Sequence, residues 1–293
     1  MKIKNIYLLI SLLFLFTSCY DKEEALKAEL DEVPYKVEDS SDPLDHLVYQ
    51  IYTNNRSIVR YKFNDLEYEW NMVRALMAGD SKVEVEFQED KDVLLKGLTY
   101  LQTEFFDFYK GKIKKEWMPF KVLLAKSISD VDELMGRIPK PVLGGLNHIL
   151  VGNIDENIDK LTAEQKKKFN EELHGRYWTY YLYKYARITI PYEFFEVSSK
   201  YEDSLSTDDD GNALPNKDGY WYINDIYAVW GDYGPNRDMD VKQFFGKIVT
   251  TPYSELKPLL DANSKLKQKY DILVNHLKAY YNVDIQAIGD SAK

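Results

Sequence analysis

Apolar residues recur at helical spacing through several long stretches of this chain. The clearest stretch spans 162–187: it opens with the capping-box signature Thr162-Ala163-Glu164-Gln165, and Pro191 lies just beyond its end. Further helices are predicted over 44–52, 90–109, 240–248 and 254–281. The second half of the chain is therefore expected to be largely helical.

Shorter runs in the first half have the pattern of β-strands. Residues 57–63 alternate between two faces, and 120–128 and 146–151 are apolar runs of strand length. Strands that precede a helical half indicate an α+β fold with a small sheet and several long helices. A polar loop is expected over 203–219, and no internal repeat or Gly/Ser linker divides the globular part.

The amino terminus has the pattern of a secretory signal. Lys2 and Lys4 precede the apolar segment Ile6–Phe16, which is too short to span a bilayer. The segment ends in Phe16-Thr17-Ser18-Cys19, which resembles the lipobox of bacterial lipoproteins, where the signal is cleaved before a cysteine that is then acylated. An ordinary secretory signal with an incidental cysteine is the alternative. Cys19 is the only cysteine, so its acylation leaves no disulfide and no cysteine ligand.

Residues 19–42 are acidic and poor in large aliphatic side chains, a composition typical of a flexible tether. Asp21, Glu23 and Glu24 follow Cys19 directly and resemble the signal that exports some lipoproteins to the outer leaflet of the outer membrane. A solubilising linker is the alternative interpretation. The expected location is the outer membrane, with the lipid as anchor. The expected organisation is a signal peptide at 1–18, a tether at 19–42 and one globular domain at 43–293.

The net charge of the chain limits the classes of molecule that it is expected to bind. It carries 38 basic and 48 acidic residues, and removal of the signal takes two lysines and no acid, which leaves a net charge of −12. Because phosphate groups are bound mainly by Lys and Arg, a surface this acidic argues against nucleic acid as a partner. The lysine clusters 110–115 and 166–168 lie in helix-like stretches and are interpreted as solvated faces.

The segment with the clearest chemical content is Asn170-Glu171-Glu172-Leu173-His174. It has the spacing of H-E-x-x-H, in which two histidines on one helix face hold Zn²⁺ and the glutamate acts as general base on the metal-bound water. Glu171 stands at the position of the base and His174 at that of the second ligand, but Asn170 replaces the first histidine. Polar residues on a tyrosine-rich helix are the alternative interpretation, since E-x-x-H also occurs by chance.

Together with Cys19, the tether and the opening Asp42-Pro43-Leu44-Asp45, this helix resembles a family of lipoproteins, the zinc-binding metallopeptidases also called substrate import-associated zinc metallohydrolases. The resemblance extends over nearly the whole mature chain, including 146–151 and 237–249. It implies a single zincin-like domain and a role beside a TonB-dependent system that imports glycans or peptides through the outer membrane of Gram-negative bacteria.

In that family the helix resembles H-H-E-F-x-H and a downstream segment resembles E-D-F-x-E. Carried over position by position, Glu171 keeps the base, His174 keeps the second ligand and Asn170 is a degenerate first ligand. Met239-Asp240-Val241-Lys242-Gln243 stands at the downstream motif, which makes Gln243 a degenerate ligand. His148, in the strand-like run before the helix, is either a substitute ligand or an imidazole packed on the sheet.

The replacement of histidine and carboxylate ligands by amides lowers the expected affinity for zinc. A neutral amide oxygen suits Ca²⁺ better than Zn²⁺, which prefers imidazole, thiolate or carboxylate. A catalytic zinc site has only three protein ligands, and Asn170 and Gln243 compromise two of them. We therefore expect weak or absent zinc binding and lost or weakened catalysis, as in a pseudoenzyme. The alternative is an active zinc peptidase that uses a non-standard ligand such as His148.

Two aromatic clusters raise a third hypothesis. The first, 177–185, lies on the predicted long helix and is interpreted as core, because several of its rings must face inward. The second, 220–233, contains Trp221, Trp230 and Tyr233, and two interpretations stay open for it: core packing, or exposed rings that stack on sugars. The third hypothesis is therefore a glycan-binding surface lipoprotein.

Overall fold

The computed structural model describes residues 36–69, 82–132, 136–201, 209, 215–221 and 237–291. The elements described belong to one compact unit, Val37–Lys293. Cys19, the signal segment and residues 19–35 of the tether lie outside the described residues. Within the described part of the chain, no helix combines the length and the hydropathy that a bilayer span requires.

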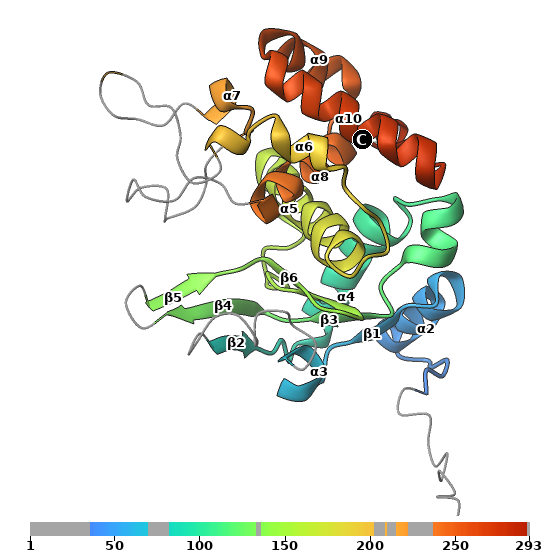
Figure 1. Cartoon of the computed structure of the whole chain (residues 1–293). Helices are drawn as coiled ribbons and strands as arrows, with labels where there is room; N and C mark the ends of the chain where they lie inside the picture. The colour runs from blue at the N-terminus through green and yellow to red at the C-terminus, as the bar shows by residue number, and fades with distance from the viewer. Residues whose placement is uncertain are drawn as a thin grey trace, which may run out of the picture. The chain divides into compact units, whose positions relative to one another are not determined.

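Strands and helices alternate in the first half of the compact unit, and helices fill the second half (Figure 1). The strands are β1 (Ile58–Arg60), β2 (Lys82–Glu86), β3 (Lys121–Leu124), β4 (Ser127–Asp132), β5 (Gly136–Pro139), β6 (Val142–Gly144) and β7 (His148–Val151). The α-helices are α2 (Pro43–Asn55), α3 (Asp65–Glu69), α4 (Lys91–Leu101), α5 (Ala163–Arg176), α6 (Tyr192–Glu196), α7 (Pro215–Asp218), α8 (Arg237–Thr250), α9 (Tyr253–Ala262), α10 (Ser264–Tyr281) and α11 (Ile285–Asp290). Short π-helical segments are η2 (Gln102–Phe106), η3 (Ile113–Trp117) and η4 (Tyr177–Tyr183), and η5 (Ser199–Tyr201) is a 3₁₀ turn. The predicted α+β fold is confirmed.

The strands form two small sheets. One has the order β1-β3-β7-β6, in which β1, β3 and β7 run parallel and β6 runs antiparallel at the edge. The other is antiparallel, with the order β2-β4-β5. Strands β3 and β7 are buried along their whole length, as is usual for parallel strands that are covered on both faces.

The four-stranded sheet separates two apolar clusters, because side chains alternate between the faces of a strand. Val122, Ile149 and Val151 belong to the main core, which also contains the buried residues of α4, α5 and α8. Leu123 and Leu150 face the other way and belong to a smaller cluster beside β2 and β4. Helix α5 therefore lies on the main-core face of the sheet, and α3 lies on the opposite face (Figure 1).

Helix α5 begins at the predicted capping box. The Gln165 main-chain N–H donates to the Thr162 hydroxyl at 3.2 Å, and the Thr162 N–H donates to the Gln165 side chain at 2.9 Å. The helical run continues past Arg176 as η4, so the sequence pattern located the longest run correctly up to Tyr183. Tyr177, Trp178 and Tyr181 of η4 are buried, which confirms that this aromatic cluster belongs to the core.

Two glycines set the crossing of α5 and α8. A Cβ at Gly246 would lie 2.5 Å from the carbonyl oxygen of Glu171, and a Cβ at Gly175 would lie 2.7 Å from the carbonyl oxygen of Lys242. A side chain at either position would collide with main chain, which cannot turn aside as a flexible side chain can. The glycines therefore fix which α8 side chains reach Glu171 and Glu172.

The helix predicted over 254–281 is two helices in the structure. Asn263 has extended backbone angles, and its side chain accepts hydrogen bonds from the N–H groups of Lys265 and Leu266 at 3.1 and 3.0 Å. Asparagine competes with helical hydrogen bonding in this way, so it starts a new helix although the apolar spacing runs on. The strand predicted over 57–63 is also shorter, because only β1 pairs with β3.

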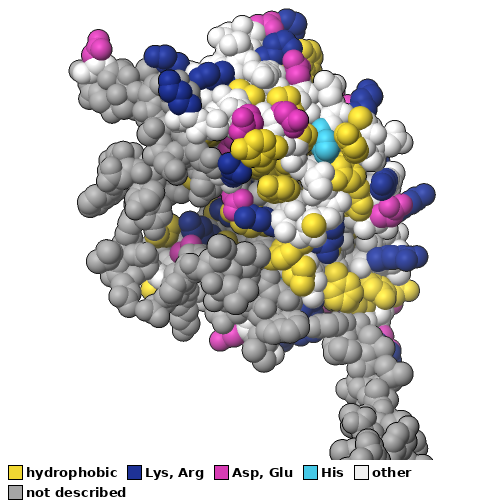
Figure 2. All heavy atoms as spheres, viewed as in Figure 1, with side chains coloured by type: hydrophobic (Ala, Val, Ile, Leu, Met, Phe, Trp, Pro, Cys, Tyr) yellow, Lys and Arg dark blue, Asp and Glu magenta, His cyan; other side chains and the backbone are white. Residues whose placement is uncertain are grey.

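Charged side chains of both signs are interspersed on the face shown in Figure 2, although the chain is acidic overall. The lysine cluster 166–168 follows this arrangement, since each of its lysines pairs with a glutamate: Lys166 with Glu104, Lys167 with Glu255 and Lys168 with Glu164. Its interpretation as a charged helix surface agrees with these pairs.

Candidate functional site

Asn170, at the position of the first metal ligand, is held by two hydrogen bonds to the α4–η2 segment. The Tyr100 hydroxyl donates to Asn170 Oδ1 at 2.7 Å, and Asn170 Nδ2 donates to Glu104 Oε2 at 2.9 Å. The other oxygen of Glu104 pairs with Lys166, one turn before Asn170 on α5, at 2.6 Å. Both ends of the amide are therefore engaged, and the neighbouring carboxylate has a lysine as its cation.

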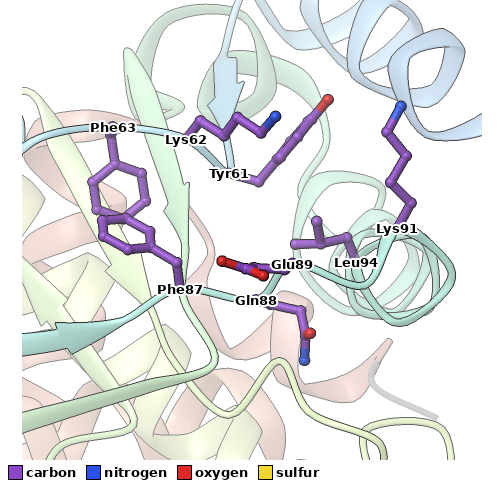
Figure 3. Close-up of a pocket in the computed structure, with 8 residues that line it drawn as sticks. All are labelled: Tyr61, Lys62, Phe63, Phe87, Gln88, Glu89, Lys91 and Leu94. Carbon is purple, nitrogen blue, oxygen red and sulfur yellow. The ribbon is translucent and has the colours of Figure 1, made fainter.

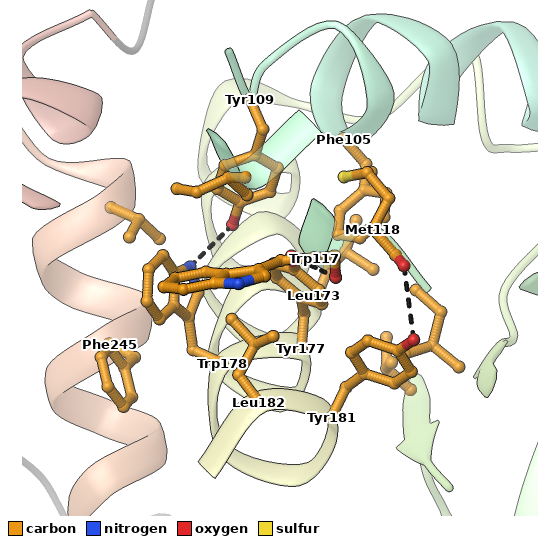
Figure 4. Close-up of a cluster of buried hydrophobic side chains, with 14 of the residues drawn as sticks. Phe105, Tyr109, Trp117, Met118, Leu173, Tyr177, Trp178, Tyr181, Leu182 and Phe245 are labelled. Atoms are coloured by element: carbon orange, nitrogen blue, oxygen red, sulfur yellow. Dashed lines mark hydrogen bonds between the residues drawn. The ribbon is translucent and has the colours of Figure 1, made fainter. Parts of the chain in front are cut away.

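His174, one turn further along α5, is fully buried among aromatic rings. Its Nδ1 shares a hydrogen bond with the Tyr109 hydroxyl at 2.7 Å. Trp178 Nε1 donates to the same oxygen at 2.9 Å, as Figure 4 shows. The rings of Phe105 and Phe108 lie with their centroids 5.9 and 4.6 Å from that of His174. The imidazole is thus part of the aromatic core.

The surroundings of His174 fix its charge and favour one tautomer. Burial lowers the pKa of His174 to about 3, and the main chain of Glu104 opposes this only in part. The ring is therefore neutral at neutral pH. The Tyr109 oxygen already accepts the Trp178 N–H, and we assign its own proton to the bond with His174 Nδ1, which leaves the ring proton on Nε2. A nitrogen that carries a proton cannot coordinate a metal.

Glu171, at the position of the general base, faces α8. Its Oε1 pairs with Lys247 Nζ at 2.7 Å, and its side chain is 9% exposed. A base that activates water needs a carboxylate oxygen directed at that water. In this structure one carboxylate oxygen of Glu171 is paired with the ammonium group of Lys247.

The next residue, Glu172, is the centre of a second ion cluster between α5 and α8. Its two oxygens pair with Arg176 Nε and Lys242 Nζ, each at 2.7 Å. Burial alone would raise the pKa of Glu172, but the two cations outweigh it and lower the pKa to about 2. Folding therefore favours the charged form of Glu172, and this contribution is fully present at neutral pH.

His148, the possible substitute ligand, is the first residue of β7 and is buried. It pairs in register with Lys121 and shares a sheet face with Leu150 in the smaller cluster. Burial, with a further contribution from the Lys121 charge, lowers its pKa to about 4. A Cβ at Gly145 would lie 2.2 Å from His148 Cε1, so the ring packs against that turn. The sheet lies between His148 and the candidate ligands of α5.

In the downstream segment, Lys242 pairs with Glu172 of α5, and the side chains of Asp240 and Gln243 are buried. Gln243 is 4% exposed within α8, on the helix whose glycine contacts α5. Asp240, the acid of the same segment, pairs with Lys269 of α10 at 2.5 Å, and both side chains are buried. The structure thus uses this segment to join α8 to its neighbouring helices.

The aromatic residues proposed for sugar stacking fall into two groups. Trp221 is 7% exposed, and its ring packs against Phe244 with centroids 5.5 Å apart. A stacking platform needs an open ring face, so Trp221 has the environment of a core residue. Trp230 and Tyr233 lie outside the described residues.

Comparison with known proteins finds a solved structure with a similar fold. No family model and no curated protein sequence matches the chain. A crystal structure from Bacteroides caccae, of a protein named a "putative zinc-binding metallo-peptidase", matches with a TM-score of 0.52 and 12% sequence identity, over 87% of this chain and 93% of that chain. This chain has a metallopeptidase-like fold. At such low identity the similarity extends to the fold alone.

The donor set of this metallopeptidase-like fold does not fit a catalytic zinc. Within the described residues, no group of three or more His, Cys, Asp or Glu lies close enough together to hold a metal. Of the two donors on one face of α5, the amide of Asn170 is hydrogen-bonded at both ends and the imidazole of His174 is buried under Phe108. Zinc catalysis needs three donors around an open position, and this helix face supplies neither.

The sequence pattern did not predict which residues form hydrogen bonds or ion pairs with the motif residues of α5. Tyr100, Glu104 and Tyr109 come from α4, η2 and the residues after it, and Lys247 comes from α8. None of these residues belongs to a sequence motif, because each contacts α5 only once the chain is folded. The helical spacing over 90–109 predicts that this segment packs against something, but it does not predict that it packs against α5.

Proposed function

We propose that this protein is a lipoprotein with a metallopeptidase-like fold that has lost or weakened zinc catalysis. In this proposal it acts as a binding or scaffold component of a TonB-dependent nutrient-uptake system at the outer membrane. The similarity of fold supports descent from a metallopeptidase. The lipobox resemblance at Cys19 supports the membrane anchor, and the family resemblance supports the uptake system.

One observation carries the loss of catalysis. The three side chains at the motif positions are turned to four different residues: Asn170 to Tyr100 and Glu104, His174 to Tyr109, and Glu171 to Lys247. An active site needs them directed at one point beside an open cleft. A neutral, hydrogen-bonded amide and a buried imidazole serve instead to join α5 to its neighbours.

Peptide hydrolysis tests this proposal. We expect the purified full-length protein, supplied with Zn²⁺, to cleave a broad library of fluorogenic peptides no faster than its Glu171→Gln variant. Chelator should leave any residual rate unchanged, because that rate would belong to a contaminant. Cleavage that chelator suppresses and Glu171→Gln eliminates would instead establish an active enzyme.

A single observation favours the second candidate, an active zinc peptidase with a non-standard ligand. His174 Nε2 is buried and makes no hydrogen bond of good geometry among the described residues, although the main chain of Glu104 lies close enough to act on the pKa of the ring. A buried polar atom without a partner is costly, and a metal ion would satisfy it once the proton left. This candidate requires two further donors beside His174, and the hydrolysis assay separates it from our proposal.

A further inference from the structure

A cavity of about 430 Å³ opens at the N-terminal end of α4, between the segments that follow β1 and β2 (Figure 3). Tyr61, Lys62 and Phe63 line it from the segment after β1, and Phe87 and Glu89 line it from the segment after β2. Its volume lies within the usual range of small-ligand sites, about 300–1,000 Å³. Asn170 meets α4 at Tyr100, near the other end of that helix.

One wall of the cavity is aromatic and open. The rings of Phe63 and Phe87 pack edge to face with centroids 4.9 Å apart, and Phe87 remains 39% exposed. Phe87 continues the alternation of Val83 and Val85 just beyond the end of β2, so it extends the apolar face of that strand into the cavity. Leu94, which is buried, adds a further apolar surface. A ligand with an apolar group would remove the Phe87 ring from water.

The fixed polar groups of the cavity are already engaged. Tyr61 donates its hydroxyl proton to Asp45 Oδ1 at 2.6 Å, and Lys91 pairs with Asp42 at 2.6 Å. Gln88 donates to the Ile154 carbonyl at 3.0 Å and accepts from the Asp90 N–H at 3.0 Å. These bonds shape the cavity and leave little capacity for a ligand.

Lys62 and Glu89 differ from these groups. Both line the cavity and are exposed, and among the described residues neither side chain forms an ion pair or a hydrogen bond. No salt bridge joins them to each other although their charges are opposite. A ligand that carries both charges would pair with both residues.

We propose that this pocket binds a zwitterion with an apolar side group, that is, an amino acid or a short peptide with free termini. Glu89 receives the ammonium group, Lys62 the carboxylate, and the Phe63–Phe87 wall the apolar side chain. A neutral sugar would leave both charges uncompensated, and an edge-to-face aromatic pair is a poor platform for two flat ring faces. The inference does not depend on the state of the α5 motif.

Equilibrium dialysis of the full-length protein at pH 7 tests the assignment, with the dipeptide Leu-Phe as probe. We expect one saturable site per chain. N-acetyl-Leu-Phe-amide, which has the same side chains but no charges, should bind at least about tenfold more weakly, because each charged hydrogen bond that is lost costs about a factor of ten or more. Maltotriose should not compete with Leu-Phe.

Single substitutions connect the binding to the pocket. Glu89→Gln, Lys62→Met and Phe87→Ala should each weaken Leu-Phe binding by about tenfold or more. Glu156→Gln and Lys160→Met make the same kinds of change at exposed residues outside the cavity, and they should leave the affinity within about twofold. All five substitutions are at exposed positions, and thermal unfolding of each variant confirms that it is folded.

Three results would overturn the proposal. They are no saturable uptake of Leu-Phe, equal binding of the capped and the free dipeptide, and the same loss of affinity in the pocket variants as in the controls. Displacement of Leu-Phe by maltotriose would replace the zwitterion with a sugar as the ligand of this pocket.

Discussion

Replacement of Lys269 by methionine is expected to lower the free energy of unfolding by about 3–5 kcal/mol. Lys269 is fully buried in α10, where its ammonium group lies 2.5 Å from Asp240 Oδ2 and within hydrogen-bond reach of the Ser198 hydroxyl and the Gly219 carbonyl. Three rings surround the same group at 4.6–5.1 Å: those of Phe194, Tyr220 and Phe244. Methionine fills a similar volume but leaves a buried carboxylate without its cation.

Urea unfolding of Lys269→Met measures this loss, and two further variants define its cause. Lys267→Met changes a lysine on the same helix whose pair with Asp271 is exposed, so it should change the unfolding midpoint little. The double variant Lys269→Met/Asp240→Leu removes both charges and should recover most of the lost stability. Equal losses in Lys267→Met and Lys269→Met would contradict a special role for the buried pair.

Lowering the pH from 7.5 to 5 is expected to reduce the free energy of unfolding by about 2 kcal/mol for each of two buried histidines. The pKa of His148 is lowered to about 4 and that of His174 to about 3, chiefly by burial. Below pH 6.5 the unfolded chain therefore takes up protons that the folded chain does not, and acid favours unfolding. Glu172, whose pKa is about 2, loses its stabilising charge only at lower pH.

The variant His148→Leu isolates one half of this effect. Leucine is apolar and suits the position of His148, which is buried and shares a sheet face with Leu150 of the smaller cluster. The fall in the free energy of unfolding between pH 7.5 and pH 5 should be about 2 kcal/mol smaller in this variant than in the parent protein, since His174 and His276, whose pKa values are also lowered, remain. An unchanged pH dependence would show that the folded protein accepts a proton at His148.

The fold could be predicted from the sequence where local signals and apolar spacing agree. Thr162 and Gln165 marked the start of α5, and the spacing of apolar residues carried the helical run to Tyr183. The pattern failed at Asn263, where one side chain that caps a helix outweighs eighteen residues of continuing periodicity in α10. The hairpin β4–β5 was also missed, because its pairing depends on contacts between strands.

The candidate site was less predictable than the fold. Spacing alone placed Asn170 and His174 on one helix face, and both do contact the same α4–η2 region and the residues after it. Whether such a helix face binds a metal or packs into the core depends on the residues that lie opposite it. Here Tyr100 and Tyr109 lie opposite, and no local rule links either tyrosine to α5.

The zinc content of the purified full-length protein tests the central claim most directly. The protein is saturated with Zn²⁺, passed through gel filtration and analysed for metal beside the His174→Ala variant. Our account predicts well under one zinc per chain and the same value for both proteins, because a buried imidazole and a hydrogen-bonded amide cannot complete a site. One zinc per chain in the parent protein, removed by His174→Ala, would contradict it.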